Sequence, residues 1–138
     1  MERSTRQRTS IRDAIRDAGR PLGPVEILEA ARGAVPALSL ATVYRTVRRL
    51  AESGEIQAVT LPGESVRYEI AGGTHHHHFQ CTACSRVFDV HACPGNLARL
   101  APEGFTVEDH ELTLYGRCRE CQPARRGAKR GAPGRAGG

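Results

Sequence analysis

The sequence predicts an α+β fold in two parts, a helical N-terminal part and a C-terminal part rich in metal-binding side chains. Two observations lead to this prediction. All five cysteines and all six histidines of the 138-residue chain lie between His75 and Cys121. The earlier residues instead show three stretches with helical spacing of apolar side chains and two short stretches typical of strands. We therefore expect one domain over residues 1–72 and a second over residues 73–121.

The overall composition is that of a globular protein. Hydrophobic residues make up 39 % of the chain and charged residues 25 %. No apolar run reaches the roughly 20 residues of a membrane span, and no apolar segment follows the basic N-terminus as it would in a secretory signal. We therefore expect a cytoplasmic protein with no membrane partner.

Positive charge is concentrated at the C-terminal end. The formal net charge is +5, and residues 122–138 hold five basic side chains and no acidic one. This tail is rich in Gly, Ala, Pro and Arg and cannot bury a core, so we expect it to be disordered. It either adds nonspecific attraction to nucleic acid and anionic surfaces or is simply solvated.

Three helices are expected in the N-terminal part. Apolar residues recur at helical spacing over residues 8–18 and again over 24–32. Gly19 ends the first of these stretches. Ser39 is a typical N-cap for a third helix, which we expect to end at Gly54.

A two-stranded hairpin is expected to follow the helices. Residues 56–61 and 66–70 have strand character, and the Pro-Gly-Glu sequence at 62–64 is a turn signal. Three short helices followed by a hairpin is the order of a winged helix-turn-helix domain.

The third helix is the candidate DNA-binding element. Its N-terminal turn and its polar faces offer groups that can reach phosphates or base edges. Its candidate DNA-binding residues are Ser39, Thr42, Tyr44, Arg45, Arg48 and Arg49. The alternative is a helical bundle with a solvated charged face.

Four of the five cysteines form two Cys-x-x-Cys pairs. The pairs are Cys81 with Cys84 and Cys118 with Cys121. Each pair turns two thiolates toward one point, and four thiolates in a tetrahedron suit a structural Zn²⁺ ion. A predicted strand over 86–90 and a long one over 105–115 can bring the two pairs together.

Other uses of these cysteines fit less well. A disulfide framework is typical of exported proteins. A thioredoxin-type pair needs a βαβ setting, and a cytidine-deaminase-type zinc site needs His-x-Glu and Pro-Cys-x-x-Cys sequences. Neither context is present. Cys93 stands outside both pairs, and we expect it to be a small buried residue or a spare thiol rather than a ligand.

Four consecutive histidines, residues 75–78, directly precede the first cysteine pair. On an extended strand His76 and His78 would point one way, and His75 and His77 the other. The tetrad would then supply halves of two metal sites. Further candidate ligands nearby are Glu69, Asp89, His91 and His110.

These motifs together resemble the ferric uptake regulator family over about residues 6–121. The resemblance lies in Ala41-Thr42-Val43-Tyr44-Arg45, Tyr68-Glu69, the histidine tetrad, both cysteine pairs and Leu114-Tyr115-Gly116. It implies a homodimeric transcriptional repressor with a winged helix and an α/β dimerisation domain. Such a repressor binds double-stranded operator DNA when a corepressor metal is present. The family includes iron, zinc, manganese, nickel and peroxide sensors.

The resemblance also implies three metal sites. Both cysteine pairs match the structural zinc site. Glu69, His76, His78 and Asp89 match a hinge-side sensory site for a second divalent metal, Fe²⁺ or Zn²⁺, with Mn²⁺ as an alternative. A further site matches His75, His77 and His110, with His91 as a substitute for the Glu that the family usually has where this chain has Asn96.

Two other departures leave the identity of the sensory metal open. Residues 20–24 lack the His that iron sensors often place near the second helix, and residues 70–74 lack the Cys that zinc sensors often place before the tetrad. Gln57 either donates a carbonyl oxygen to the sensory site or is a solvated strand residue.

Enzymatic chemistry has little support in this sequence. We find no candidate catalytic triad, phosphate loop or dinucleotide fingerprint. We therefore expect no enzymatic activity and no small-molecule substrate. The competing interpretations are a zinc-ribbon interaction module and a metal-dependent hydrolase at the tetrad, both without specific DNA binding.

Overall fold

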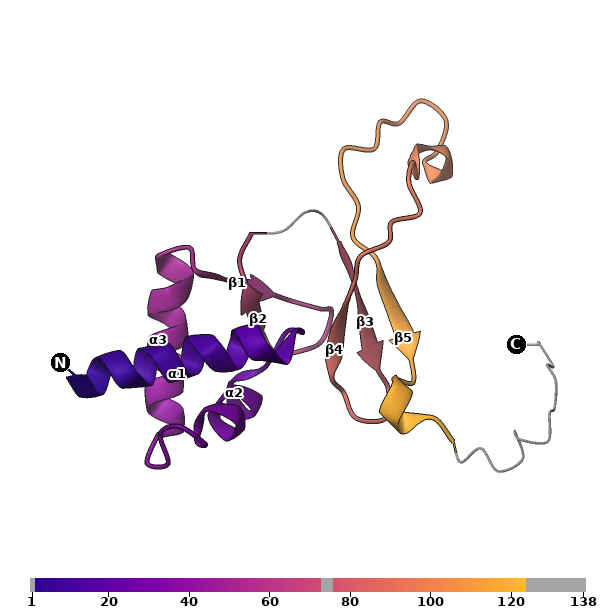
Figure 1. The fold of residues 1–138 in the computed structure, drawn as a ribbon. Helices are drawn as coiled ribbons and strands as arrows, with labels where there is room; N and C mark the ends of the chain where they lie inside the picture. Colours follow the sequence, from indigo (N-terminus) through magenta and orange to yellow (C-terminus); the bar gives the residue numbers. More distant parts are fainter. Residues whose placement is uncertain (1, 73–75, 124–138) are drawn as a thin grey trace.

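The structure is a computed structural model that describes residues 2–72 and 76–123. It has two lobes, one with three helices and a two-stranded hairpin and the other with a three-stranded sheet (Figure 1). His75 and nearly all of the predicted basic tail lie outside the described residues. The domain boundary at residues 72 and 73 stays a prediction. Within the described ranges, no helix is long and apolar enough to cross a membrane.

The three predicted helices are present. They are α1 (Glu2–Ala18), α2 (Pro24–Ala31) and α3 (Leu40–Glu52). α1 begins before residue 8, and apolar spacing did not signal its first turns because residues 3–6 face solvent. Gly19, with a φ of 67°, ends α1. Ser39 caps α3, since its Oγ accepts a hydrogen bond from the Thr42 backbone N–H at 3.1 Å.

One apolar core joins the helices to the hairpin. α3 contributes Val43, Val47 and Leu50, each at most 1 % exposed. Burying a side chain of this size stabilises a fold by about 1.5–3 kcal/mol. The other large members of this core are Ile11, Ile15, Leu22, Ile27, Leu38 and Ile56. Polar residues occupy the faces of α3 that point away from this core, so these residues are exposed to solvent.

The hairpin consists of β1 (Ile56–Val59) and β2 (Arg67–Ile70), which are shorter than the predicted strands. They pair antiparallel, with Gln57 opposite Glu69. Leu22 also pairs with Tyr68 through two backbone hydrogen bonds of 2.9 and 2.8 Å, which tie the α1–α2 connection to β2. The hairpin is therefore fixed to the helices rather than projecting freely.

The second lobe is built on a sheet of β3 (His77–Cys81), β4 (Val87–Val90) and β5 (Thr113–Gly116). The strand order is β4-β3-β5, with β3 antiparallel to β4 and parallel to β5. Because β3 and β5 are parallel, their carboxyl ends meet at one edge of the sheet, where Cys81 lies opposite Gly116.

The prediction of a long strand over 105–115 is wrong for most of its length. Only β5 is a strand, and it begins opposite His78, near the start of β3. Residues 105–112 form no regular element, because β3 does not extend far enough to pair with them. Together with a short 3₁₀ turn, Ala98–Leu100, they belong to the loop that extends away from the sheet (Figure 1).

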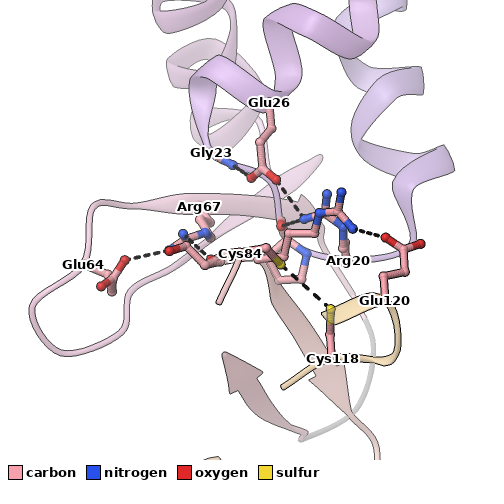
Figure 2. Close-up of polar contacts among 11 residues, drawn as sticks. Arg20, Gly23, Glu26, Glu64, Arg67, Cys84, Cys118 and Glu120 are labelled. Carbon is pink, nitrogen blue, oxygen red and sulfur yellow. Dashed lines mark hydrogen bonds and ion pairs between the residues drawn. The ribbon is translucent and has the colours of Figure 1, made fainter. Parts of the chain in front are cut away.

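The two lobes contact each other at the turn between Cys81 and β4. Val59 and Leu61 of the first lobe pack on Val87 in a small apolar cluster. Arg67, only 9 % exposed, donates from Nη2 to the Ser85 backbone carbonyl at 2.8 Å. Figure 2 shows Arg67 between Glu64 and the turn that carries Cys84. The segment that follows Cys84 is thus in direct contact with the hairpin.

Candidate metal centres and DNA-binding surface

The four paired cysteines converge at the edge where β3 and β5 end. Cys81 closes β3, Cys84 follows in the turn, and the second pair follows β5 directly. One sulfur of each pair faces the other pair, with Cys84 Sγ 3.8 Å from Cys118 Sγ (Figure 2). All four sulfurs lie within 4.8 Å of one another. The spacing and the donor type are those of a tetrahedral zinc site.

The surroundings of this cluster prepare it for a cation. Backbone N–H groups of Cys84, Cys118 and Ala83 donate to Cys81 Sγ at 3.3–3.4 Å and lower the pKa of this thiol to about 6. Hydrogen bonding to the sulfurs of Cys118 and Cys81 raises the pKa of Cys121 to about 12. One thiolate is therefore stabilised by the backbone, but four thiolates need a bound dication.

A second cluster lies between the lobes and consists of Glu69, His76, His78 and Asp89. His76 Nε2 is 3.3 Å from Glu69 Oε2 and 3.1 Å from Asp89 Oδ1, and His78 Nε2 is 3.5 Å from the same Asp89 oxygen. His78 and Asp89 are direct partners in the β3–β4 ladder, so their side chains share one face. The four ligand atoms lie within 4.8 Å of one another.

Two buried atoms of this cluster are placed as ligands of one cation would be. The buried atoms His78 Nε2 and Asp89 Oδ1 face each other at 3.5 Å, which is a weak contact rather than a full hydrogen bond. Burial, followed by the neighbouring Glu69, raises the pKa of Asp89 to about 6, and burial lowers the pKa of His78. Two imidazoles and two carboxylates form a donor set that suits a borderline or hard divalent ion.

Gln57 does not offer its oxygen to this cluster. Its Nε2 donates to Glu69 Oε2 at 2.8 Å, across the β1–β2 pair. Gln57 therefore holds the carboxylate in position from behind, which is neither of the two roles considered from the sequence. Outer hydrogen bonds of this kind orient metal-binding carboxylates.

A third cluster combines His77, Cys93 and His110. Cys93 Sγ is 3.3 Å from His77 Nε2 and 3.4 Å from His110 Nε2, and the two imidazole rings stack with centroids 5.0 Å apart. Cys93 is exposed, so it is not the small buried residue that was one of the two roles expected for it, and its sulfur contacts both rings. His75 lies outside the described residues, so its predicted role here is not described.

His91 lies elsewhere than the prediction for this third cluster requires. Its ring centroid is 5.6 Å from that of His76, beside the cluster between the lobes, and it is not among the residues that gather around Cys93. The register of β3 and β4 explains why Cys93 reaches the third cluster. Val90 is the ladder partner of His77, so a residue just past the end of β4 returns to the start of β3.

The candidate DNA-binding residues line the exposed side of α3. Tyr44 is 54 % exposed, and Arg45, Arg48 and Arg49 are exposed as well. At the N-terminal turn, Arg45 Nη2 donates to Thr42 Oγ1 at 3.1 Å, and Ser39 is occupied with the cap. The face opposite the core is thus a polar surface that presents three guanidinium groups.

The fold and its clusters define the class: a winged-helix protein with candidate metal-binding residues in its second lobe. A sequence model described as the ferric uptake regulator family matches residues 2–115. The peroxide operon regulator of Bacillus subtilis is 36 % identical over 100 residues, which span 70 % of this chain and 68 % of that protein.

Two solved structures support the same assignment. The Helicobacter pylori ferric uptake regulator, described as having three functional metal-binding sites, is 26 % identical over 86 % of this chain and 81 % of its own, with a TM-score of 0.65. A zinc-bound manganese uptake regulator is 27 % identical over 81 % of this chain and 87 % of its own, with a TM-score of 0.71. The chain belongs to the ferric uptake regulator family, whose members are metal-dependent transcriptional regulators and not enzymes.

Proposed function

We propose that this protein is a repressor that binds operator DNA as a homodimer when a second divalent metal occupies Glu69, His76, His78 and Asp89. The observation that supports this most is the position of Glu69. It belongs to β2 of the DNA-binding lobe, and its carboxylate lies 3.3 Å from His76, which precedes β3 of the other lobe. An ion held by all four residues would therefore bridge the two lobes.

The bridge would work by selecting one arrangement of the lobes. Without a cation, burial of Asp89 and, after it, repulsion from the neighbouring Glu69 carboxylate raise the pKa of Asp89 to about 6. A bound ion would neutralise this repulsion and favour the closed arrangement, to the extent that it binds this arrangement more tightly than an open one. In a dimer, the spacing of two α3 helices must match adjacent DNA half-sites, so the bridge would control operator affinity.

The four paired cysteines would hold a structural Zn²⁺ ion. Zinc stabilises the junction where β3 and β5 end, and this junction also contacts the hairpin through Ser85 and Arg67. We propose that this ion stays bound while the metal of the lobe-bridging cluster exchanges.

The metal sensed at the lobe-bridging cluster is proposed from its donors. Two nitrogens and two oxygens without sulfur favour Fe²⁺ or Zn²⁺, with Mn²⁺ as the alternative. Peroxide sensing is a further alternative because the chain is similar to a peroxide operon regulator, and nickel is another because imidazole ligands also suit it. A repressor acts where its operator lies, so we propose a cytoplasmic location.

The test uses genomic DNA fragments that the metal-loaded protein retains on a filter and releases with a chelator. One such fragment becomes the operator probe. His76→Ala with His78→Ala should abolish the metal-dependent gain in affinity for this fragment, whereas Glu103→Gln, an exposed acid in the same lobe, should leave it unchanged. Undiminished metal dependence in the double variant would refute the proposed sensory site. Failure of the normal protein to retain any fragment would refute DNA binding itself.

A further inference from the structure

We propose that Cys93 is a metal ligand, and that His77, Cys93 and His110 bind a thiophilic divalent ion such as Zn²⁺ in preference to Fe²⁺ or Mn²⁺. The inference deepens the proposed function, because it assigns the ligands and the metal class of the further site. Its test is independent of DNA binding. The sequence suggested histidines alone for this site, and a thiolate changes which ions it accepts.

The distances from Cys93 Sγ to the two imidazole nitrogens are close to those between ligand atoms around a bound metal ion. A tetrahedral zinc ion with bond lengths of about 2.3 Å to sulfur and about 2.0 Å to nitrogen separates these ligand atoms by roughly 3.5 Å. The Cys93 sulfur lies 3.3 Å from one imidazole nitrogen and 3.4 Å from the other. A small outward movement of each ligand atom is enough to admit the ion.

The fold brings these three residues together from separate segments. His77 opens β3 and is 2 % exposed, so its imidazole is held firmly by its surroundings. Cys93 lies just past the end of β4, whose Val90 pairs with His77. His110 precedes β5, and the Leu112 carbonyl accepts a hydrogen bond from the His78 backbone N–H at 3.2 Å, which fixes this approach to β3. The buried His77 gives the site a rigid ligand, and the exposed Cys93 leaves it accessible to solvent.

Two other side chains considered for this site, Asn96 and His91, have partners elsewhere. The Asn96 side-chain oxygen accepts a hydrogen bond from the Ala98 backbone N–H at 2.8 Å, so it serves its own loop. The His91 ring lies next to His76, beside the other cluster. Cys93 is the residue that completes the group with His77 and His110 among the described residues.

The chemistry of the donors separates this site from the lobe-bridging cluster. A thiolate with two imidazoles favours zinc and other thiophilic ions, whereas carboxylates accept harder ions such as Fe²⁺ and Mn²⁺. The Cys93 thiol would release its proton to solvent as the ion binds. Because Cys93 is exposed in the free protein, a bound ion should also shield its sulfur from alkylating reagents.

The experiment uses the full chain with zinc already bound to the paired cysteines and Co²⁺ as a spectroscopic probe. Co²⁺ should produce a thiolate-to-cobalt charge-transfer band and should protect Cys93 from maleimide, as mapped by mass spectrometry. Cys93→Ala should lack the band. Any weak band that remains in this variant would come from Co²⁺ that has replaced zinc at the paired cysteines. His110→Ala should weaken Co²⁺ binding at least about tenfold, because even outer-shell changes cost about 10–100-fold.

His91→Ala is the matched control, because it removes an exposed imidazole two residues away and should leave the band intact. An equal band in Cys93→Ala, or equal alkylation of Cys93 with and without Co²⁺, would overturn the proposal. The His76→Ala, His78→Ala protein should keep the Cys93 band. If the normal protein shows the band but binds no DNA, the proposed function fails and this inference stands.

Discussion

At the scale of single residues, the four paired cysteines are expected to be indispensable. Cys81→Ser should lower the zinc content and disrupt the junction of β3 and β5, because Cys81 Sγ is also the acceptor of three backbone N–H groups. Structural zinc contributes about 10–16 kcal/mol of binding free energy in small domains, which is comparable to the whole stability of a typical fold. We therefore expect Cys81→Ser to lose the dimer.

The measurements for Cys81→Ser are metal analysis and sedimentation. Cys93→Ser is the control, since it removes a cysteine from outside the pairs and should retain the structural zinc and the dimer. A folded dimer of Cys81→Ser without zinc would contradict the assignment.

Asp89 is expected to be a ligand that costs stability when no metal is bound. Burial and Glu69 raise the pKa of Asp89 from 3.8 to about 6, so its stability contribution is full below about pH 4 and is lost as the pH rises through 6. At pH 7 in chelator, Asp89→Asn should stabilise the protein by about 1–2 kcal/mol. The gain should disappear below about pH 4.

Urea unfolding at the two pH values checks this prediction, with Asp109→Asn, an exposed acid near the same sheet, as the control. The same Asp89→Asn protein should lose its metal-dependent stabilisation. A destabilised variant at pH 7 would show that Asp89 makes a stabilising contact in the metal-free protein.

At the scale of elements, the contact between the hairpin and the segment that follows Cys84 should contribute to stability. Arg67 donates to the Ser85 carbonyl at 2.8 Å and is largely buried. Arg67→Ala should cost about 1–3 kcal/mol of unfolding free energy, because it leaves that carbonyl without its charged donor. Arg67→Lys keeps the charge and should recover part of the loss.

Unfolding of the zinc-loaded protein in guanidinium measures this cost. Arg48→Ala, which removes an exposed guanidinium from α3, should change stability by less than about 0.5 kcal/mol. Equal effects of Arg67→Ala and Arg48→Ala would mean that the two lobes are not coupled at this turn.

The elements also show how far the sequence predicts the fold. The helices were predictable because their apolar spacing and caps are local, as at Ser39 and Gly19. The strand over 105–115 was not, because alternation at Phe105 and Val107 predicts an extended strand but does not indicate whether a neighbouring strand exists. Of residues 105–116, only 113–116 pair with β3, so the strand is confined to them.

The candidate sites likewise divide into residues that a local pattern places and residues whose position depends on strand register. Alternation along the tetrad was enough to separate His76 and His78 from His77. Cys93 could not be assigned in this way, because its approach to His77 depends on the β3–β4 register, which no local pattern encodes. The position of Gln57 behind Glu69 depends on the β1–β2 register for the same reason.

At the scale of the whole molecule, exposed apolar side chains are concentrated in the second lobe. The large apolar residues exposed there are Leu100, Phe105, Val107, Leu114 and Tyr115. β5 is also an edge of its sheet, so one side of its backbone is unpaired within the chain. Exposed apolar side chains and an open strand edge are both typical of a protein–protein interface. We expect this surface to form the homodimer.

Phe105 and Leu114 provide the test of that surface. Phe105 is 70 % exposed and Leu114 is 44 % exposed, so replacing both with Arg should leave the fold of the single chain intact while introducing two charges at the interface. Charge repulsion and desolvation should shift the protein to a monomer in sedimentation experiments. Val25→Arg alters an apolar residue of α2 that is 54 % exposed, and it should remain dimeric.

The consequence for DNA binding depends on the number of recognition helices. A monomer presents one α3 helix and can contact only one half-site, so it loses the contribution of the second. The Phe105→Arg, Leu114→Arg protein should therefore bind the operator at least about 100-fold more weakly while still binding zinc at its paired cysteines. If it stays dimeric, the interface lies elsewhere; if it is monomeric yet binds the operator with full affinity, one α3 helix is enough for recognition.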